Sequence, residues 1–306
     1  MTEKGASRAQ IIAAFASIYI IWGSTYLAIR YAIETIPPFI MGGTRFLVSG
    51  ALLYLWARSR GASRPTKLHW RNAIIAGGFL LLGGNGAVVW AEQFVPSGLT
   101  ALLVSILPIW LVIIEWVRPP RKRPTGAVLV GLVLGFIGII VLVGPGNVSG
   151  QGDVRPLGAL VLIFGSLSWA IGSFWSRDAK LPESALLTTG MEMLGGGALL
   201  IIIGVLSGEL SHLDIHHVSR SSTVGLVYLI TFGSLLGFTS YIWLLDKVSP
   251  AHLGTYAYVN PIVAVVLGWA IAGERLSIRT GVAAAIVICA VALITSARNT
   301  TAGQSG

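Results

Sequence analysis

Charged residues and cysteine are both scarce in this sequence. Only 11% of the 306 residues are Asp, Glu, Lys or Arg, whereas soluble domains carry about 25%. So few charges are not enough to cover the surface of a soluble protein of this length, so a soluble globular domain is excluded. The single cysteine, Cys289, excludes a disulfide or a cysteine metal cluster within one chain.

Long apolar segments are present instead. Hydrophobic residues make up 54% of the chain, and the mean hydropathy is +0.79. A helix needs about 20 apolar residues to cross the bilayer core. Ten segments satisfy this length, at 11–30, 38–57, 72–92, 98–117, 126–145, 157–176, 184–206, 223–245, 251–272 and 278–296. Because the connections are short, we predict an all-α membrane protein with ten transmembrane helices in one compact bundle.

The charge is unevenly distributed. The 21 basic residues outnumber the 12 acidic ones, which gives a net charge of +9. Most Lys and Arg fall in short runs between apolar segments, which is the pattern of cytoplasmic loops and not of a nucleic-acid-binding face. We therefore expect both termini in the cytoplasm and no nucleic-acid partner. The first segment lacks a small-residue cleavage site after it, so it is expected to be a membrane span and not a signal peptide.

The sequence contains an internal repeat. "VPSGLTALLVSILPIWLV" aligns with "VSPAHLGTYAYVNPIVAV", so that Pro108 falls on Pro261, and Trp22 falls on Trp169 in the same order. The chain thus divides into two five-helix halves, 1–150 and 151–306. Because five is odd, the second half must lie upside down in the membrane. Inverted repeats around a central cavity are typical of secondary transporters, which work by alternating access.

An Asn-Pro pair lies in the middle of the ninth segment. Proline removes a helix hydrogen bond, and asparagine needs a partner that hydrocarbon cannot supply. We expect Pro108 and Pro261 to break the fourth and ninth helices, and Asn260 to bind substrate or the freed backbone. Its counterpart, Leu107, is apolar. A kink that serves packing alone is the alternative.

Several stretches resemble a known family. They are "YIIWGSTYLAIRYAIETIPP", the Arg-Phe pair of the second segment, and "NPIVAVVLGWAIAGERLS". With ten helices in two halves, the chain resembles the drug/metabolite transporter superfamily, in its ten-helix EamA-type branch. The resemblance implies a bacterial inner-membrane exporter or facilitator of amino acids, other metabolites or drugs. It also implies a basket of helices around a cavity, with the fifth and tenth helices set apart as support.

One feature departs from a symmetric repeat. Gly273 and Glu274 follow the ninth helix, whereas the matching place in the first half has Pro120 and Arg121. A structural cap is the meaning that we expect for the Gly-Glu pair.

Aromatic and amide side chains share helix faces in several segments. Tyr19, Trp22, Tyr26 and Arg30 form one stripe in the first segment. Such a face can line a cavity and hold an ammonium group by cation–π contact. Packing and interfacial anchoring are the alternative. The predicted substrate-binding residues are Trp22, Tyr26, Asn85, Trp169, Tyr241, Tyr256 and Asn260.

Ionisable residues within membrane spans are functional candidates by default. They are Arg45, Glu92, Glu115 and Glu192. Arg45 and Glu192 lie deepest and occupy matched positions in the two halves, while Glu92 and Glu115 lie near helix ends. We predict a gating or proton-handling role for Arg45, Glu92 and Glu192. A permanent Arg45–Glu192 pair, or two separately bonded groups, is the alternative.

The sequence favours a secondary transporter that exports small organic metabolites such as amino acids or similar amphipathic compounds. Import and sugar-phosphate exchange are alternatives, but phosphate needs buried Lys or Arg clusters and only Arg45 lies deep. A membrane enzyme acting on a lipid is the alternative from another class, and it would need convergent acids, bases or a metal.

No catalytic residue, cofactor or metal site is predicted. His212, His216 and His217 lie in a predicted extracytoplasmic loop without a ligand scaffold. The expected partners are a small-molecule substrate and the lipid bilayer. A monomer is compatible with the sequence, which does not determine the oligomeric state, the coupling ion or the exact substrate.

Overall fold

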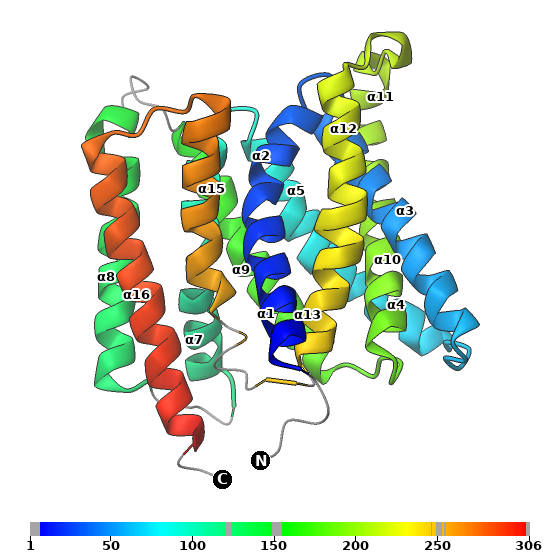
Figure 1. The fold of residues 1–306 in the computed structure, drawn as a ribbon, viewed down its shortest axis with the longest axis horizontal. Helices are drawn as coiled ribbons and strands as arrows, with labels where there is room; N and C mark the ends of the chain where they lie inside the picture. The colour runs from blue at the N-terminus through cyan, green and yellow to red at the C-terminus, as the bar shows by residue number, and fades with distance from the viewer. Residues whose placement is uncertain are drawn as a thin grey trace.

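The computed structural model describes residues 7–119, 124–148, 155–245, 247–248, 253 and 255–303. Every regular element among them is a helix (Figure 1). Pro120 and Arg121, which the sequence sets against the Gly-Glu pair, lie outside the described residues.

The first half contains four long apolar helices and one shorter one. The first and third are each interrupted by a π-helical segment, and the fourth is split in two. The elements are α1 (Arg8–Ala16), η1 (Ser17–Ile21) and α2 (Trp22–Ala32); α3 (Pro38–Ser59); α4 (Lys67–Gly77), η2 (Gly78–Asn85) and α5 (Gly86–Ala91); α6 (Ser97–Val104) and α7 (Leu107–Val117); and α8 (Gly126–Val148).

In the second half the first helix is continuous, two short elements follow the second helix, and the third helix again contains a π-helical segment. The elements are α9 (Pro156–Asp178); α10 (Ala185–Leu206); the short α11 (Glu209–His212) and η3 (Ile215–His217); α12 (Arg220–Tyr228), η4 (Leu229–Leu236) and α13 (Gly237–Leu245); α15 (Tyr256–Ala272); and α16 (Ile278–Gly303). Figure 1 shows that the first helix begins and the last helix ends at the same end of the bundle.

Seven of these helices are long and apolar enough to cross a membrane, namely Arg8–Ala32, Pro38–Ser59, Lys67–Ala91, Ser97–Val117, Pro156–Asp178, Ala185–Leu206 and Arg220–Leu244. Three shorter apolar helices cover Gly126–Leu142, Tyr256–Ala272 and Ile278–Ile294. Each of the ten predicted segments overlaps one of them. The inverted relation of the two halves stays a prediction.

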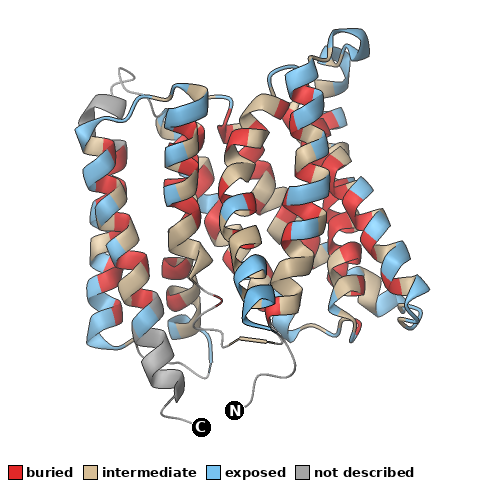
Figure 2. Cartoon of the chain, in the orientation of Figure 1, coloured by how far each residue is buried: buried red, intermediate tan, exposed pale blue. Residues whose placement is uncertain are grey.

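The outer surface of the bundle carries large apolar side chains. Leu206 is 77% exposed, Ile140 68% and Phe164 63%. Figure 2 shows buried residues gathered on the helix sides that face the interior. Such extensive apolar exposure suits contact with lipid and would be costly in water, so the packing agrees with the composition.

Capping residues determine where several helices begin. The hydroxyl groups of Ser7, Thr66, Ser184 and Ser219 each accept a hydrogen bond from the first turn of the helix that follows. Proline occupies the first position of α3 and of α9, where its missing N–H would have no partner in any case. These residues fix where the chain enters each apolar segment.

Glycines let neighbouring backbones touch at the centre of the bundle. α10 packs along both α3 and α4. A methyl group on Gly77 of α4 would overlap the carbonyl oxygen of Glu192, and one on Gly196 of α10 would lie 2.6 Å from the carbonyl oxygen of Gly77. Because both neighbours are backbone atoms, they cannot move aside as a side chain would. Small residues at such contacts are typical of membrane helix packing.

The two prolines behave differently. Between α6 and α7 the chain turns at Ser105 and Ile106, and Pro108 is the second residue of α7, so the predicted break near Pro108 is present. Pro261 instead lies inside α15, which continues from Tyr256 to Ala272. The predicted break at Pro261 is wrong. Pro261 is the sixth residue of α15, so its missing N–H removes one intrahelical bond, the one to the carbonyl of Ala257, and the rest of the helix continues past it.

We predict that Gly77→Ala loosens the α4–α10 contact. Overpacking of this kind costs about 1–3 kcal/mol, so the variant should unfold at a lower temperature in detergent, as followed by circular dichroism. Gly281→Ala on α16 is the matched control, since a methyl group there meets no atom within 4 Å. Equal stability of the two variants would contradict the close contact.

Candidate functional site

Four aromatic rings from both halves of the chain form one cluster. The Trp22 centroid lies 5.3 Å from Tyr241, 5.3 Å from Tyr256 and 5.4 Å from Phe238, and the Tyr241 and Tyr256 centroids are 5.9 Å apart. These tilted and edge-on arrangements are the ones that aromatic pairs prefer. The rings come from α2, α13 and α15 and are only half-buried. We call Trp22, Phe238, Tyr241 and Tyr256 the aromatic cluster.

Two tryptophans pack on glycines in a matched way. The Trp22 indole N–H donates to the carbonyl oxygen of Gly233 at 3.2 Å, and a methyl group on Gly237 would overlap the same ring. Trp169 packs on Gly84, where a methyl group would lie 2.7 Å from the indole. Gly84 and Gly237 are 153 positions apart, the same shift as between Pro108 and Pro261. Both glycines lie at the end of a π-helical segment, a feature common at functional sites.

Tyr26 and Asn260 adjoin the aromatic cluster. Tyr26 is four residues after Trp22 on α2 and interacts electrostatically with Tyr256. Asn260 is four residues after Tyr256 on α15 and is 8% exposed. Its Oδ1 atom is buried and has no hydrogen-bond partner among the described residues. An amide oxygen left in this way is able to accept a hydrogen bond from a ligand.

Asn85 and Trp169 belong to a second group. Asn85 follows Gly84 at the end of η2, and Trp169 lies on α9 against that glycine. No ring contact in the described part of the chain joins Trp169 to the aromatic cluster. Of the seven predicted substrate-binding residues, five are Trp22 or lie in its surroundings, and two, Asn85 and Trp169, lie by Gly84. That all seven line one cavity stays a prediction.

Arg45 and Glu192 have different partners. The Arg45 Nε donates to Ser234 Oγ at 2.9 Å, and its guanidinium lies 4.7 Å from the Phe46 ring centroid. The Glu192 carboxylate accepts from Ser176 Oγ at 2.5 Å. Among the described residues no ion pair joins Arg45 to Glu192, so this structure has two separately bonded groups.

Glu274 forms a network that the sequence did not predict in full. Its Oε1 accepts from the Ser97 backbone N–H at 2.8 Å and from the Ser97 hydroxyl at 2.7 Å, while Oε2 accepts from the Gly98 N–H at 3.0 Å. Arg30 donates to the same carboxylate at 2.5 Å. The expected structural cap is therefore present, and it caps α6. A carboxylate at a helix N-terminus is also favoured by the helix dipole. We call Arg30, Glu274 and Ser97 the α6 clamp.

Gly273 directs the chain into this clamp. It ends α15 with φ of 64°, a left-handed conformation that residues with a Cβ rarely adopt. The side chain of Glu274 is only 7% exposed, and that of Arg30 is 38% exposed. The carboxylate is therefore held inside the protein, while its arginine partner partly faces solvent.

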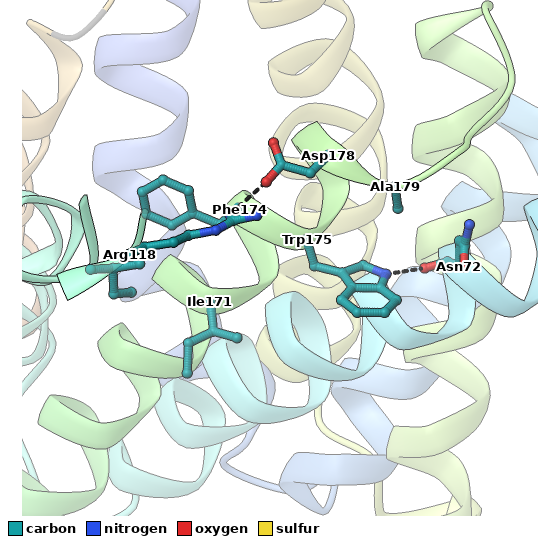
Figure 3. Close-up of a pocket in the computed structure, with 8 residues that line it drawn as sticks. Asn72, Arg118, Ile171, Phe174, Trp175, Asp178 and Ala179 are labelled. Carbon is teal, nitrogen blue, oxygen red and sulfur yellow. Dashed lines mark hydrogen bonds and ion pairs between the residues drawn. The ribbon is translucent and has the colours of Figure 1, made fainter. Parts of the chain in front are cut away.

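A second ion pair lies toward the other end of the bundle. Arg118, just after α7, contacts Asp178, the last residue of α9, at 2.5 Å. Figure 3 shows this pair beside a pocket of about 430 Å³, in which the Trp175 indole donates to the backbone oxygen of Asn72. The pocket is lined by Asn72, Ile114, Arg118, Ile171, Phe174, Trp175, Asp178 and Ala179. None of these residues was a predicted site residue.

Glu92 is the least satisfied acidic group of the described chain. It directly follows α5 and is 7% exposed. Both carboxyl oxygens are buried without a hydrogen-bond partner. The side chain interacts electrostatically with Arg30 and Glu274 of the α6 clamp and with Tyr26, which adjoins the aromatic cluster.

Only part of the clamp could be predicted from the sequence. Arg30 was placed in the stripe of the first segment, with interfacial anchoring as the alternative, and Glu274 was expected to be a cap without a named helix. Partners 177 residues apart, such as Ser97 and Glu274, are not encoded in local spacing. Because the chain has only 12 acidic residues, every acid at a predicted helix end could have been listed as a candidate for an ion pair. Such a list would have included Asp178. No group of three His, Cys, Asp or Glu that could hold a metal exists among the described residues.

Comparison with known proteins gives a consistent result. A family model described as "EamA-like transporter family" matches residues 9–144 and again residues 156–296. The chain is 39% identical over 287 residues to the uncharacterized inner membrane transporter YedA of Escherichia coli (strain K12), covering 93% of this chain and 90% of that protein. It is 24% identical to the uncharacterized transporter YoaV of Bacillus subtilis (strain 168), covering 90% and 93%.

More distant similarities extend this result. The chain is 24% identical to Protein PecM of Dickeya dadantii (strain 3937), covering 84% of this chain and 82% of that protein. A solved crystal structure superimposes with a TM-score of 0.65 at 20% identity, covering 96% of this chain and 99% of that chain. At that identity the likeness shows the fold alone.

We predict that Glu274→Ala destabilises the protein more than Arg30→Ala. Glu274 holds both Arg30 and the start of α6, and each lost hydrogen bond to a charged group costs about 1–3 kcal/mol. Arg30 loses one partly exposed contact, which is worth less. Thermal unfolding in detergent measures both, with Glu34→Ala as an exposed control. A larger loss for Arg30→Ala would contradict the role assigned to the cap.

Proposed function

The chain belongs to the EamA-like transporter family, and on that premise we propose that it exports small amphipathic organic molecules, such as amino acids, related metabolites or drugs. The observation that carries the proposal is the aromatic cluster. Three helices from both halves of the chain contribute to it, so relative movement of the halves must change it.

The chemistry of the aromatic cluster defines the kind of substrate. Aromatic faces take up apolar groups and attract ammonium groups by cation–π contact. The free amide oxygen of Asn260 adds a hydrogen-bond acceptor one helical turn from Tyr256. Apolar surface beside an acceptor suits a molecule with an apolar side chain and an N–H group. A sugar phosphate is a poorer match, because the deep Arg45 is already bonded to Ser234.

We further propose that the two halves are inverted repeats that work by alternating access. The double match of the family model supports this. The helix contacts support it too. The counterparts in the two halves are α2 and α9, α3 and α10, and η2 and η4. α9 contacts η2 as α2 contacts η4, and α10 contacts η2 as α3 contacts η4. The pairs α3–α10, α8–α16 and α6–α15 each join a helix to its own counterpart.

The two ion pairs are suited to hold the two ends of such a transporter closed. The α6 clamp joins the end of α2 to the start of α6 and the residues after α15. The Arg118–Asp178 pair joins the ends of α7 and α9. In Figure 1, α7 lies toward the end of the bundle where the chain termini are, and the α15–α16 connection lies at the opposite end. Each pair would have to open in turn during transport.

The cytoplasmic membrane of a bacterium is the proposed location. The relative YedA is named an inner membrane transporter, and the excess of basic residues favours cytoplasmic termini. A single chain is the proposed working unit. A lipid-modifying enzyme is the alternative from another class, and an assay without added cofactor separates the two: transport leaves the substrate chemically unchanged, whereas the enzyme forms a product.

We predict that Asn260→Leu, which copies Leu107, lowers transport in reconstituted liposomes roughly three- to tenfold, since one hydrogen bond contributes about 0.5–1.5 kcal/mol. Phenylalanine, other radiolabelled amino acids and ethidium form the substrate panel. Val259→Leu on the next residue is the control for added bulk. Unchanged transport by Asn260→Leu, with normal folded yield, would remove Asn260 from the site.

We predict that cysteines at Trp22, Tyr26, Trp169 or Tyr241, in a Cys289→Ala background, react with small water-soluble thiol reagents during transport. A transported compound should slow the reaction at Trp22 and Tyr241 in parallel, because these rings share one cluster. Phe164→Cys is the control, since Phe164 is 63% exposed on the apolar outer surface. Four unreactive cysteines in a transporting protein would mean that these residues only pack.

A further inference from the structure

Glu92 is a buried acid without a partner, and that arrangement is expensive. An ionised carboxylate removed from water needs a counter-charge or hydrogen-bond donors. The other deep acids of the described chain have them: Glu192 has Ser176, and Glu274 has Arg30 and the start of α6. Both oxygens of Glu92 are buried with no donor, so in this state the carboxylate form is unsupported.

We propose that Glu92 is a proton-binding site, and that in the other state of the transporter the proton leaves and Arg30 moves from Glu274 to Glu92. This inference rests on the proposed transport function, to which it adds the coupling ion. Glu92 is only 7% exposed. A proton needs less space beside a buried carboxylate than a metal ion or an organic ligand does.

The groups around Glu92 make this exchange feasible. Its electrostatic neighbours are Tyr26 and Arg30 on α2 and Glu274 in the segment after α15. Near the same loop, the Arg155 guanidinium lies 4.9 Å from the Phe94 ring centroid. Arg30 is the cation that interacts electrostatically with Glu92, so we assign it as the counter-charge of the ionised carboxylate.

Arg30 is suited to move between two acids. Its side chain is 38% exposed, and its guanidinium group is carried on a long flexible stem. While it binds Glu274, the start of α6 is held against α2. When it binds Glu92 instead, Glu274 keeps only its contacts to Ser97 and Gly98. Loss of the proton from Glu92 would thus loosen the α6 clamp, which links protonation to opening of that end.

The first test does not require a known substrate. Infrared spectra of the purified protein should contain the carbonyl stretch of a protonated carboxylic acid, shifted by exchange into D₂O. Glu92→Gln should remove this band, and Glu34→Gln, which removes an exposed acid, should leave it. A band that persists unchanged in Glu92→Gln means that Glu92 is ionised, and this overturns the proposal.

The second test measures coupling in liposomes with phenylalanine and ethidium as probes. A pH gradient should drive accumulation by the wild type and by Glu34→Gln, which removes an exposed acid. Glu92→Gln should abolish accumulation and slow exchange of labelled for unlabelled probe, because its uncharged amide cannot draw Arg30 away from Glu274. Accumulation by Glu92→Gln equal to wild type, or accumulation driven by a sodium gradient at fixed pH, overturns the proposal. Failure of the wild type to carry either probe counts against the proposed function for these compounds, while the infrared result still decides the proton site.

A double variant separates the arginine exchange from a purely structural role. Arg30→Gln should slow exchange, because ionised Glu92 then has no counter-charge. Adding Glu92→Gln should restore exchange at least severalfold over Arg30→Gln alone. If the second substitution slows exchange further, Arg30 does not serve Glu92, and the proposed movement is refuted.

Discussion

Hydrocarbon offers no hydrogen-bond partner, and this constraint governs the whole molecule. Backbone groups must be satisfied within the chain, so the apolar segments form helices. The same constraint explains why polar side chains in the interior form hydrogen bonds to specific residues. Ser234 holds Arg45 and Ser176 holds Glu192. The free N–H groups at helix starts also have partners. Glu209 accepts hydrogen bonds from the N–H groups of Phe39 and Ile40 at the start of α3, and Glu274 accepts them from the start of α6 in the same way. A fold that satisfies so many groups makes the unsatisfied ones informative.

Four residues of the described chain have unpartnered buried side-chain atoms, namely Glu92, Thr100, Trp110 and Asn260, and two of them, Asn260 and Glu92, are linked through Tyr26. Asn260 follows Tyr256 by one turn, Tyr26 interacts with both Tyr256 and Glu92, and Glu92 interacts with the α6 clamp. Unsatisfied polar groups therefore lead from the aromatic cluster to one end of the bundle. A protein that needed only stability would replace them with apolar residues at little cost. Their presence is understandable if ligand or proton supplies the missing partner for part of the working cycle.

The sequence predicted the fold better than the site, for a physical reason. Apolar length is a local property, so all ten segments could be located from it, and the Trp22 and Trp169 positions could be matched from order alone. The α6 clamp depends on Arg30, Ser97 and Glu274, which only the folded bundle brings together. Pro261 was misjudged because a proline removes one bond, and a helix near its start tolerates that loss. Grouping the seven candidate residues around one cavity also went beyond what helix faces can specify, since a face does not identify its neighbour.

Differences between the halves matter as much as their similarity. A transporter with two identical inverted halves would have the same chemistry at both ends. Here Asn260 corresponds to apolar Leu107, and Arg45 corresponds to Glu192. The α6 clamp places a nearly buried carboxylate on a helix start, whereas the Arg118–Asp178 pair is exposed by 47% and 35% at its side chains. Water screens the second pair far more than the first, so the two ends respond differently to loss of a nearby charge. In the proposed mechanism, the repeat lets the two ends exchange roles, and the unequal residues determine which end is linked to the proton.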